Sequence, residues 1–120
     1  MRADAHRLPG PYVPPHGALW LAQAGDDAIG CVALRPLPDG IAEVKRMYVD
    51  GAWRGKGVGR ALLETLIEHA RTLGYHRLRL GTITEMTAAK SLYRALGFVP
   101  IERYRADEMV DTEFYEKDLG

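Results

Sequence analysis

The chain has 120 residues, of which 47% are hydrophobic and 27% are charged. This balance is typical of one soluble globular domain and excludes a disordered chain. The formal net charge is zero, so we expect no general affinity for nucleic acid or membrane surfaces. No apolar run approaches the roughly 20 residues that cross a bilayer. The N-terminus lacks the apolar stretch of a signal peptide, and the single cysteine, Cys31, predicts a reducing, cytoplasmic location.

The first part of the chain divides into an irregular segment and three strands. Prolines and glycines concentrate before residue 18, so we predict an irregular N-terminal segment over residues 1–17 and a single domain over residues 18–120. Strand-forming residues predict strands over 18–24, 28–37 and 41–49, joined by the turns Gly25-Asp26-Asp27 and Pro38-Asp39-Gly40. Short turns between consecutive strands predict an antiparallel meander.

The loop after the third strand holds alternating glycines and cations. The glycines are Gly55, Gly57 and Gly59, and the cations are Arg54, Lys56 and Arg60. Glycine lets the backbone approach a ligand closely, and the amide groups at the start of a helix attract phosphate. The spacing fits neither a P-loop nor the dinucleotide fingerprint G-x-G-x-x-G. We therefore expect a ligand that carries a polyphosphate but is not bound in either of those ways.

Downstream, apolar residues recur at helical spacing from about Gly59 to Leu73, and Gly74 is placed to cap this helix. A strand follows over residues 76–82, then a second helix from about Met86 to Leu96, ended by Gly97. Late strands are predicted over 99–103 and 112–117. The strand–helix–strand unit over residues 41–82 predicts a right-handed parallel crossover. The fold class is therefore α/β with a mixed central sheet flanked by helices.

Two motifs within these elements resemble those of the GNAT superfamily of acetyl-CoA-dependent N-acetyltransferases. The first is R-x-x-G-x-G at Arg54, Gly57 and Gly59, and the second is A-x-x-L-Y-x-x-x-G-F from Ala89 to Phe98. One position departs from the family, because Met86 stands where an asparagine that helps hold the pantetheine arm is common. The resemblance covers roughly residues 18 to 119. It implies the GNAT fold, shortened at its N-terminus by the usual strand and two helices.

The resemblance also implies site residues. Acetyl-CoA, the expected acyl donor, should run beside the strand at Met47, Tyr48 and Val49. Its pyrophosphate should lie on the loop and helix start, formed by Arg54, Gly55, Lys56, Gly57, Val58, Gly59 and Arg60. Glu43 is the candidate catalytic base, acting directly or through water, and its alternative is a strand carboxylate paired with Lys45 or Arg46. Tyr93 is the candidate acid for the departing thiolate, and its alternative is a core aromatic residue.

The expected function is transfer of acetyl from acetyl-CoA to a primary amine of a small molecule or protein, by direct attack in a ternary complex. The alternative is a CoA-binding or oligomerising regulatory module without turnover, because the acceptor side looks short. Uncovered apolar sheet predicts a homo-oligomer, with a dimer the first expectation. The acidic residues over 102–118 either attract a cationic acceptor or form a solvated face. The four histidines are scattered, and we predict no metal site.

Overall fold

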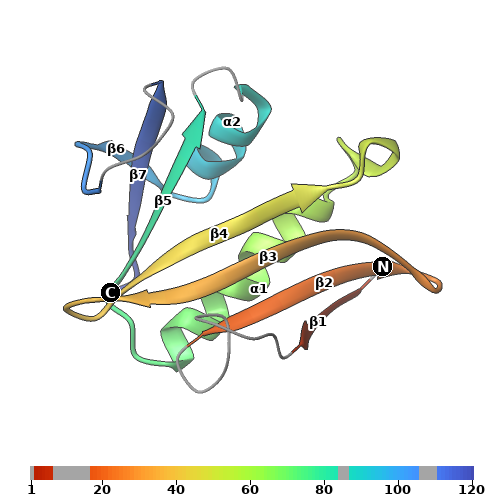
Figure 1. Ribbon diagram of the computed structural model, residues 1–120, viewed down its shortest axis with the longest axis horizontal. Coiled ribbons are helices and arrows are strands. Elements are labelled where there is room, and N and C mark those ends of the chain that lie inside the picture. The colour runs from red at the N-terminus through yellow and green to blue at the C-terminus, as the bar shows by residue number, and fades with distance from the viewer. Residues whose placement is uncertain (1, 7–16, 84–86, 106–110) are drawn as a thin grey trace.

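The computed structural model describes residues 2–6, 17–83, 87–105 and 111–120. Two helices, a 3₁₀ turn and seven strands follow one another in these ranges (Figure 1). They are β1 (Arg2–His6), β2 (Ala18–Ala24), β3 (Asp27–Leu37), β4 (Ile41–Val49), a 3₁₀ turn (Gly51–Trp53), α1 (Val58–Thr72), β5 (Arg77–Ile83), α2 (Thr87–Ala95), β6 (Val99–Ile101) and β7 (Thr112–Asp118). The strands form one sheet in the order β1-β2-β3-β4-β5-β7-β6.

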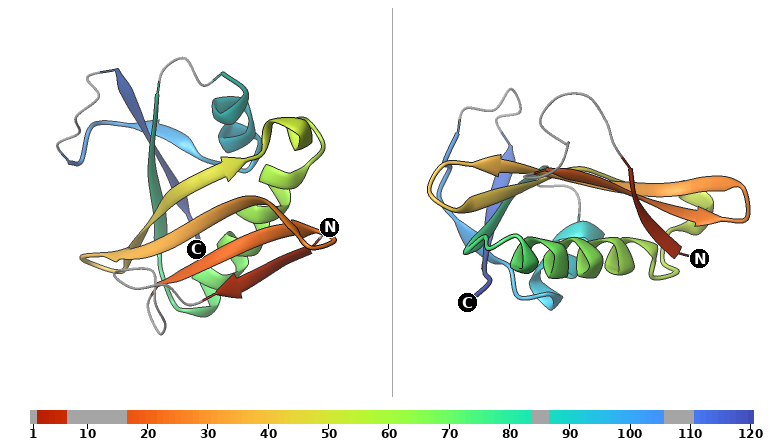
Figure 2. Two further views of the ribbon diagram at one scale, coloured as in Figure 1. Left: turned by 45° about the vertical axis from the view of Figure 1, so that its right-hand side comes forward. Right: turned by 90° about the horizontal axis from the view of Figure 1, so that it is seen from below.

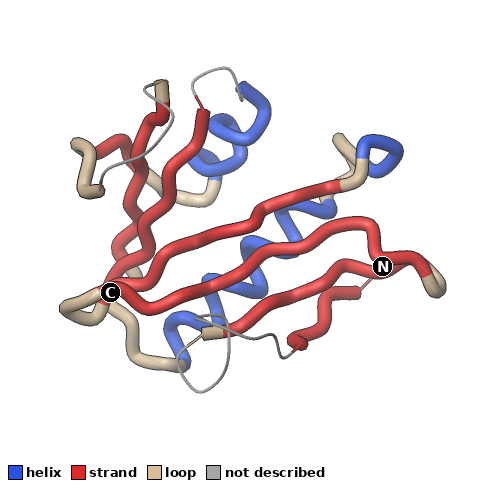
Figure 3. The backbone as a smooth tube through the Cα atoms, in the orientation of Figure 1, coloured by secondary structure: helices blue, strands red, loops and turns tan. Residues whose placement is uncertain are grey.

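The mixed sheet confirms the predicted architecture. Strands β2, β3 and β4 are an antiparallel meander, and β4 pairs with β5 in parallel after the crossover through α1. Strand β7 then lies antiparallel between β5 and β6. The figures show α1 running beneath β2, β3 and β4 (Figures 1 and 2). The backbone tube shows β4 and β5 spreading apart from the end at which they pair (Figure 3).

The N-terminal prediction was wrong in part. Residues 2–6 are not irregular but form β1, which pairs antiparallel with β2 at the edge of the sheet. The expected absence of an N-terminal strand is therefore also wrong. Proline and glycine content drew attention to residues 8–17, which lie outside the described residues except for Gly17. The strand before them is short and its apolar positions are alanines, which have low strand propensity, so its pairing with β2 was not anticipated.

Alternation along the strands separates two faces of the sheet. Val32, Leu34, Ala42 and Val44 are buried in the main core with the apolar stripe of α1. The residues between them on β3 and β4 point to the opposite face, as period-two geometry requires. Cys31, Ala33 and Leu19 form a second, smaller cluster there.

Both helices end as the sequence predicts. After α1, the amide of Gly74 donates to the carbonyl of Arg71 and the amide of Tyr75 to that of Ala70, with Gly74 at φ 88°. After α2, the amide of Phe98 donates to the carbonyl of Tyr93, and Gly97 has φ 94°. These are glycine-dependent helix caps, in which only glycine adopts the left-handed backbone without a steric cost. They set the directions in which β5 and β6 leave the helices.

Candidate active site

The site begins where β4 and β5 separate. Their parallel pairing is limited to Ile41–Glu43 with Arg77–Arg79, after which the strands diverge (Figure 1). A cavity of about 290 Å³ lies in the gap, between strands that no longer satisfy each other's backbone groups. Its lining comes from β4, β5 and α2, and consists of Val44, Lys45, Arg46, Met47, Leu80, Gly81, Thr82, Ala89 and Tyr93. An extended polar chain can enter here and pair with the freed edge of β4.

A bulge shapes β4 beside this cavity. Cys31 pairs with Tyr48 and Ala33 with Lys45, so β4 has an extra residue between these pairs. Arg46 lies in the bulge with φ 54°, a left-handed backbone that is uncommon for a residue other than glycine. Its carbonyl accepts a weak hydrogen bond from the Cys31 thiol, with Sγ 3.1 Å away. The bulge changes the direction of β4 where the strand leaves β5.

The glycine loop continues from the end of β4 into α1. Gly55 and Gly57 have φ values of 74° and 85°, so both positions favour glycine, as their place in the motif predicts. Gly57 is the N-cap of α1 and offers no side-chain hydrogen bond to the first turn. The first backbone bond of the helix runs from the amide of Ala61 to the carbonyl of Gly57. The amides of residues 58–60 therefore remain available to an anion, and no acidic residue lies in this turn.

The loop cations take different positions. The Nε atom of Arg54 donates to the carbonyl of Val49 at 3.2 Å, which holds the start of the guanidinium against the end of β4. The Nζ atom of Lys56 lies 5.9 Å from the centre of the Trp53 ring. Arg60 forms an exposed ion pair with Glu64 at 3.6 Å. Arg54 and Lys56 thus make contacts within the segment between β4 and α1, whereas Arg60, in the first turn of α1, shares its charge with a neighbouring carboxylate.

Gly59 brings the loop and the cavity together. A Cβ atom at this position would lie 3.0 Å from Cε of Met47 and 3.4 Å from Cδ2 of Leu92. The absence of a side chain therefore lets α1 approach both β4 and α2. Because Met47 also lines the cavity, the cavity and the helix start are adjacent. Of the other predicted β4 residues, Val49 packs against the core, whereas the Tyr48 side chain is 53% exposed and does not line the cavity.

Tyr93 is packed as a core aromatic residue, which is one of the two interpretations that the sequence left open. Its ring is packed in the core, with the ring centres of Phe98 and Tyr115 at 5.8 and 6.3 Å. The residue nevertheless lines the cavity. Burial raises the pKa of the Tyr93 phenol to about 12. Its hydroxyl group is therefore protonated at neutral pH, and it can donate a hydrogen bond but cannot serve as a base.

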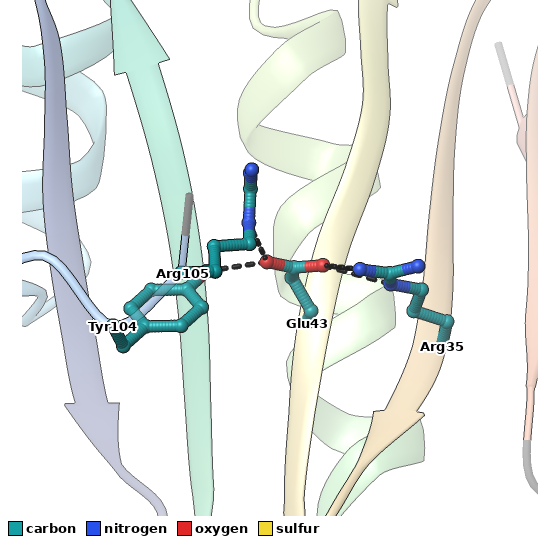
Figure 4. A network of polar contacts seen from close by, with 4 residues as sticks. All are labelled: Arg35, Glu43, Tyr104 and Arg105. Carbon is teal, nitrogen blue, oxygen red and sulfur yellow. Dashed lines mark hydrogen bonds and ion pairs between the residues drawn. The ribbon is translucent and has the colours of Figure 1, made fainter. Parts of the chain in front are cut away.

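Glu43 lies at the centre of a polar network on the face opposite α1 (Figure 4). The carboxylate is fully buried. Its Oε1 atom accepts hydrogen bonds from Nε and Nη2 of Arg35, the residue opposite it on β3, both at 2.8 Å. Its Oε2 atom accepts from the Tyr104 hydroxyl at 2.5 Å and from Nε of Arg105 at 2.8 Å. The partners are therefore Arg35 and Arg105, not the Lys45 or Arg46 of the sequence-based alternative.

The network changes the acid–base properties of its members. Burial tends to raise the pKa of Glu43, but the hydrogen bonds from Tyr104 and Arg105 and the charge of Arg105 outweigh it, so that the pKa is lowered. Burial, together with the hydrogen bond to the Glu43 carboxylate, raises the pKa of Tyr104. Glu43 is therefore ionised at neutral pH and binds a proton weakly. The carboxylate organises two guanidinium groups at the edge of the site.

Sequence reasoning missed Arg35, Tyr104 and Arg105 as members of the site. Tyr104 and Arg105 follow β6 and are more than 60 positions from Glu43 along the chain. No motif links them to the predicted site. Arg35 had a signal that could have been used, because the predicted turn at Pro38-Asp39-Gly40 fixes the register that places it opposite Glu43. A residue facing a buried carboxylate across a hairpin is a natural ionic partner.

The acidic residues near the C-terminus are engaged in part by internal ion pairs. Glu116 pairs with Arg79 at 2.7 Å, and Glu113 pairs with Lys90 at 3.3 Å. These two carboxylates hold β7 against β5 and α2 and are not available as a free acidic surface. Asp107 and Glu108, which the sequence grouped with them, lie outside the described residues.

In ranges 2–6, 17–83, 87–105 and 111–120, no group of three or more histidine, cysteine or acidic side chains is placed to hold a metal ion. In the same part of the chain, no helix is long and apolar enough to cross a membrane.

Comparison with known sequences gives a family. Residues 3–98 match the acetyltransferase (GNAT) family. An uncharacterized N-acetyltransferase of Schizosaccharomyces pombe is 37% identical over 111 residues, which is 91% of this chain and 68% of that protein. N-acetyltransferase 8F1 of Rattus norvegicus is 33% identical over 103 residues (82% of this chain), and rat N-acetylaspartate synthetase is 38% identical over 86 residues (71% of this chain). The chain spans 47% and 29% of those two rat proteins.

Solved structures agree with this assignment. A GNAT-family acetyltransferase from Staphylococcus aureus Mu50 has a TM-score of 0.79 at 27% identity, over 87% of this chain and 69% of its own. A GNAT-family acetyltransferase from Elizabethkingia anophelis with acetyl-CoA bound shares the fold at 21% identity, with a TM-score of 0.78 over 98% of this chain and 97% of its own. Acetyl-CoA is the acyl donor of this family. The predicted family and fold are thus confirmed, and the chain belongs to the GNAT family of acetyltransferases.

Proposed function

We propose that this chain transfers the acetyl group of acetyl-CoA to a primary amine of a small molecule or protein, by direct attack within a ternary complex. The observation that carries this proposal is the continuity between the cavity at the β4–β5 separation and the glycine loop, joined at Met47 and Gly59. The pantetheine arm would follow β4 at Met47, Tyr48 and Val49. The pyrophosphate would lie on the amides of residues 55–60, with Arg54, Lys56 and Arg60 around it.

Tyr93 is our candidate donor to the departing sulfur. It lines the cavity and keeps its proton at neutral pH. A thiol has a pKa of about 8.5, well below that of this phenol, so a hydrogen bond from Tyr93 can stabilise the developing thiolate without complete proton transfer. Such stabilisation acts only as charge accumulates on sulfur, which is the condition for lowering the barrier.

Glu43 is our candidate acceptor for the proton of the amine. Both of its oxygens already accept hydrogen bonds and the group is fully buried, so contact with the amine must run through an intermediate such as water or the Tyr104 hydroxyl. Its lowered pKa makes it a weak base, and positioning of both substrates would then supply much of the rate. Glu43→Gln tests this role through the pH dependence of kcat/KM.

The first experiment is titration of the chain with acetyl-CoA by calorimetry, with ATP and NAD as controls. Selective binding of acetyl-CoA is expected, because the loop spacing fits neither nucleotide motif. Turnover is then followed by CoA release with a panel of amines. Acetyl-CoA binding without turnover of any amine would favour a regulatory CoA-binding module, and no binding at all would contradict both functions.

Two variants separate the chemical roles. Tyr93→Phe should lower kcat by about 10-fold or more while acetyl-CoA affinity stays within about twofold, since only the hydroxyl is removed. Glu43→Gln should lower kcat/KM and change its pH profile if Glu43 accepts the proton. Unchanged turnover in Glu43→Gln would remove it from the mechanism. Arg71→Gln is the control, because Arg71 lies on α1 and pairs only with the exposed Glu68 among the described contacts.

We also propose a cytoplasmic homodimer. The single cysteine fits a reducing compartment. The apolar surface that motivated the dimer is smaller than expected, since the large exposed hydrophobic residues among those described are Tyr48, Leu73 and Val99. Val99 lies on β6, the strand at one edge of the sheet, which is a place for pairing between subunits. Light scattering after size-exclusion chromatography tests the assembly, and a monodisperse monomer would contradict it.

A further inference from the structure

The sheet face opposite α1 carries more cations than acids near the cavity. Glu43 stands on this face, and period-two alternation places Lys45 beside it on the same strand. Arg35 on β3 and Arg105 after β6 hold the Glu43 carboxylate from its two sides (Figure 4). The guanidinium of Arg79, on β5, lies over the Tyr104 ring, 5.1 Å from the ring centre, and also forms an ion pair with Glu116. A single buried carboxylate at the centre is thus surrounded by more than one positive charge.

The cavity itself shows the same imbalance. Lys45 and Arg46 are among its lining residues, and none of the described lining residues is acidic. Arg105 also lies close to the cavity. Gly81 lines the cavity, and the Nη2 atom of Arg105 is 3.3 Å from the position that a Cβ on Gly81 would take. A positive potential in a partly enclosed site attracts anions and repels a substrate that carries only positive charge.

Lys45 is the cation best placed to bind a substrate. It lines the cavity, the residue is partly buried, and its ammonium group has no hydrogen bond or ion pair among the side chains of the described ranges. Arg35 uses Nε and Nη2 on one oxygen of Glu43 and is 32% exposed, so part of its guanidinium still faces solvent. A partly buried lysine whose ammonium group has no protein counter-ion is a natural partner for a carboxylate of a ligand.

We infer that the acceptor amine carries a carboxylate, as in a free amino acid, and that Lys45 binds this carboxylate with support from Arg35. Glu43 then positions the guanidinium groups of Arg35 and Arg105 and prevents them from repelling each other at the edge of the site. This reverses the direction of the sequence-based suggestion that acidic residues attract a cationic acceptor. The inference rests on the proposed acetyl transfer, since it names the class of acceptor for the same site.

The test compares matched amines at saturating acetyl-CoA. L-methionine is compared with L-methioninamide and with L-methionine methyl ester, which keep the amine and side chain but lack the carboxylate. Spermidine represents a purely cationic acceptor. We expect kcat/KM for L-methionine to exceed that for the amide by about 10- to 100-fold, the range for one hydrogen bond between charged groups. The preference should shrink as ionic strength rises.

Substitutions of Lys45 test whether this residue is the source of the preference for an acceptor with a carboxylate. Lys45→Met keeps the apolar stem and should abolish the discrimination between the acid and its amide, whereas Lys45→Arg should retain most of it. Arg71→Gln, an exposed arginine on α1 away from the cavity, is the matched control and should leave the preference unchanged. Because the readout is a ratio between two substrates, a purely structural loss in Lys45→Met would lower both rates and leave the ratio unaltered.

Calorimetry separates failure of this inference from failure of the proposed function. If acetyl-CoA binds and the amide, the ester or spermidine is acetylated as well as or better than the acid, the inference is wrong and the function stands. L-glutamate, which carries a second carboxylate, is tested in the same way as L-methionine. The inference is also wrong if the CoA-loaded protein binds neither amino acid and acetylates neither. If acetyl-CoA itself does not bind, the proposed function fails, and the inference fails with it.

Discussion

The donor side and the acceptor side of this site are built by different means. The donor side consists of backbone: amides at the start of α1, glycines at φ 74° and 85°, and the edge of β4 freed from β5. The acceptor side consists of side chains from β3, β4 and the segment after β6, held together by one buried carboxylate. A backbone site can serve one invariant ligand in many proteins, whereas a side-chain site can change its substrate through a few substitutions.

The largest effect should come from the centre of the acceptor side. In Glu43→Gln the guanidinium groups of Arg35 and Arg105 lose the negative charge between them. We expect a loss of about 2–3 kcal/mol in the free energy of unfolding. This is below the usual cost of breaking a fully buried ion pair, because both arginines are partly exposed. Urea denaturation measures this loss. Acetyl-CoA affinity should change little, since the network does not include the loop.

The pH dependence of stability checks the same charge. The folded-state pKa of Glu43 is lowered, so its contribution is complete above the ordinary glutamate pKa of about 4.3 and is lost as pH falls through the folded-state value. The wild-type chain should therefore lose more stability than Glu43→Gln between neutral pH and strongly acidic pH. Parallel acid-denaturation curves for the two proteins would show that the carboxylate does not stabilise the fold.

A smaller effect is expected from the donor side. Gly57→Ala puts a side chain on a left-handed N-cap where no neighbouring atom lies within 4 Å, so the cost is backbone strain alone, about 1–2 kcal/mol. Acetyl-CoA affinity should fall, because relief of this strain turns the amides of the first turn away from the pyrophosphate. Gly51→Ala is the control: its added Cβ also meets nothing, and its φ is not in the left-handed region. Equal effects in the two variants would contradict the role given to Gly57.

The contrast also explains how much could be predicted from the sequence. Local sequence patterns determine several features of the fold, and these features were anticipated. They are the strands at Ala18–Ala24 and Ile41–Val49, the crossover through α1, and the caps at Gly74 and Gly97. The glycine loop was anticipated as well, and Gly55 and Gly57 in it have positive φ values. On the acceptor side Glu43 was anticipated, but Tyr104 and Arg105 could not be, because they reach Glu43 only through the order β5-β7-β6 of the finished sheet.

A further variant divides the acceptor network without removing its charge. Tyr104→Phe deletes the hydroxyl that donates to Oε2 of Glu43 but leaves both arginines in place. We expect a loss of about 1–2 kcal/mol in the free energy of unfolding, near the lower end for one hydrogen bond to a charged group because Tyr104 is partly exposed. Urea denaturation measures this loss. If the hydroxyl also relays the amine proton to Glu43, kcat should fall in this variant beyond what the change in stability explains. A fall in acetyl-CoA affinity instead would show that the two sides of the site are coupled.

The smallest effect is expected at the surface of α1, where Arg60 of the donor side forms an ion pair with Glu64. Arg60 and Glu64 are both about half exposed and 3.6 Å apart, so Glu64→Gln should change stability by less than about 0.5 kcal/mol. The same substitution removes a negative charge that competes with pyrophosphate for Arg60, so acetyl-CoA should bind slightly more tightly, by about twofold or less, at low salt. Calorimetry at two ionic strengths checks this, because screening should abolish the difference. A gain that persists at high salt would mean that Glu64 acts on the loop through its conformation and not through its charge, and the description of the donor side as a backbone site would then be incomplete.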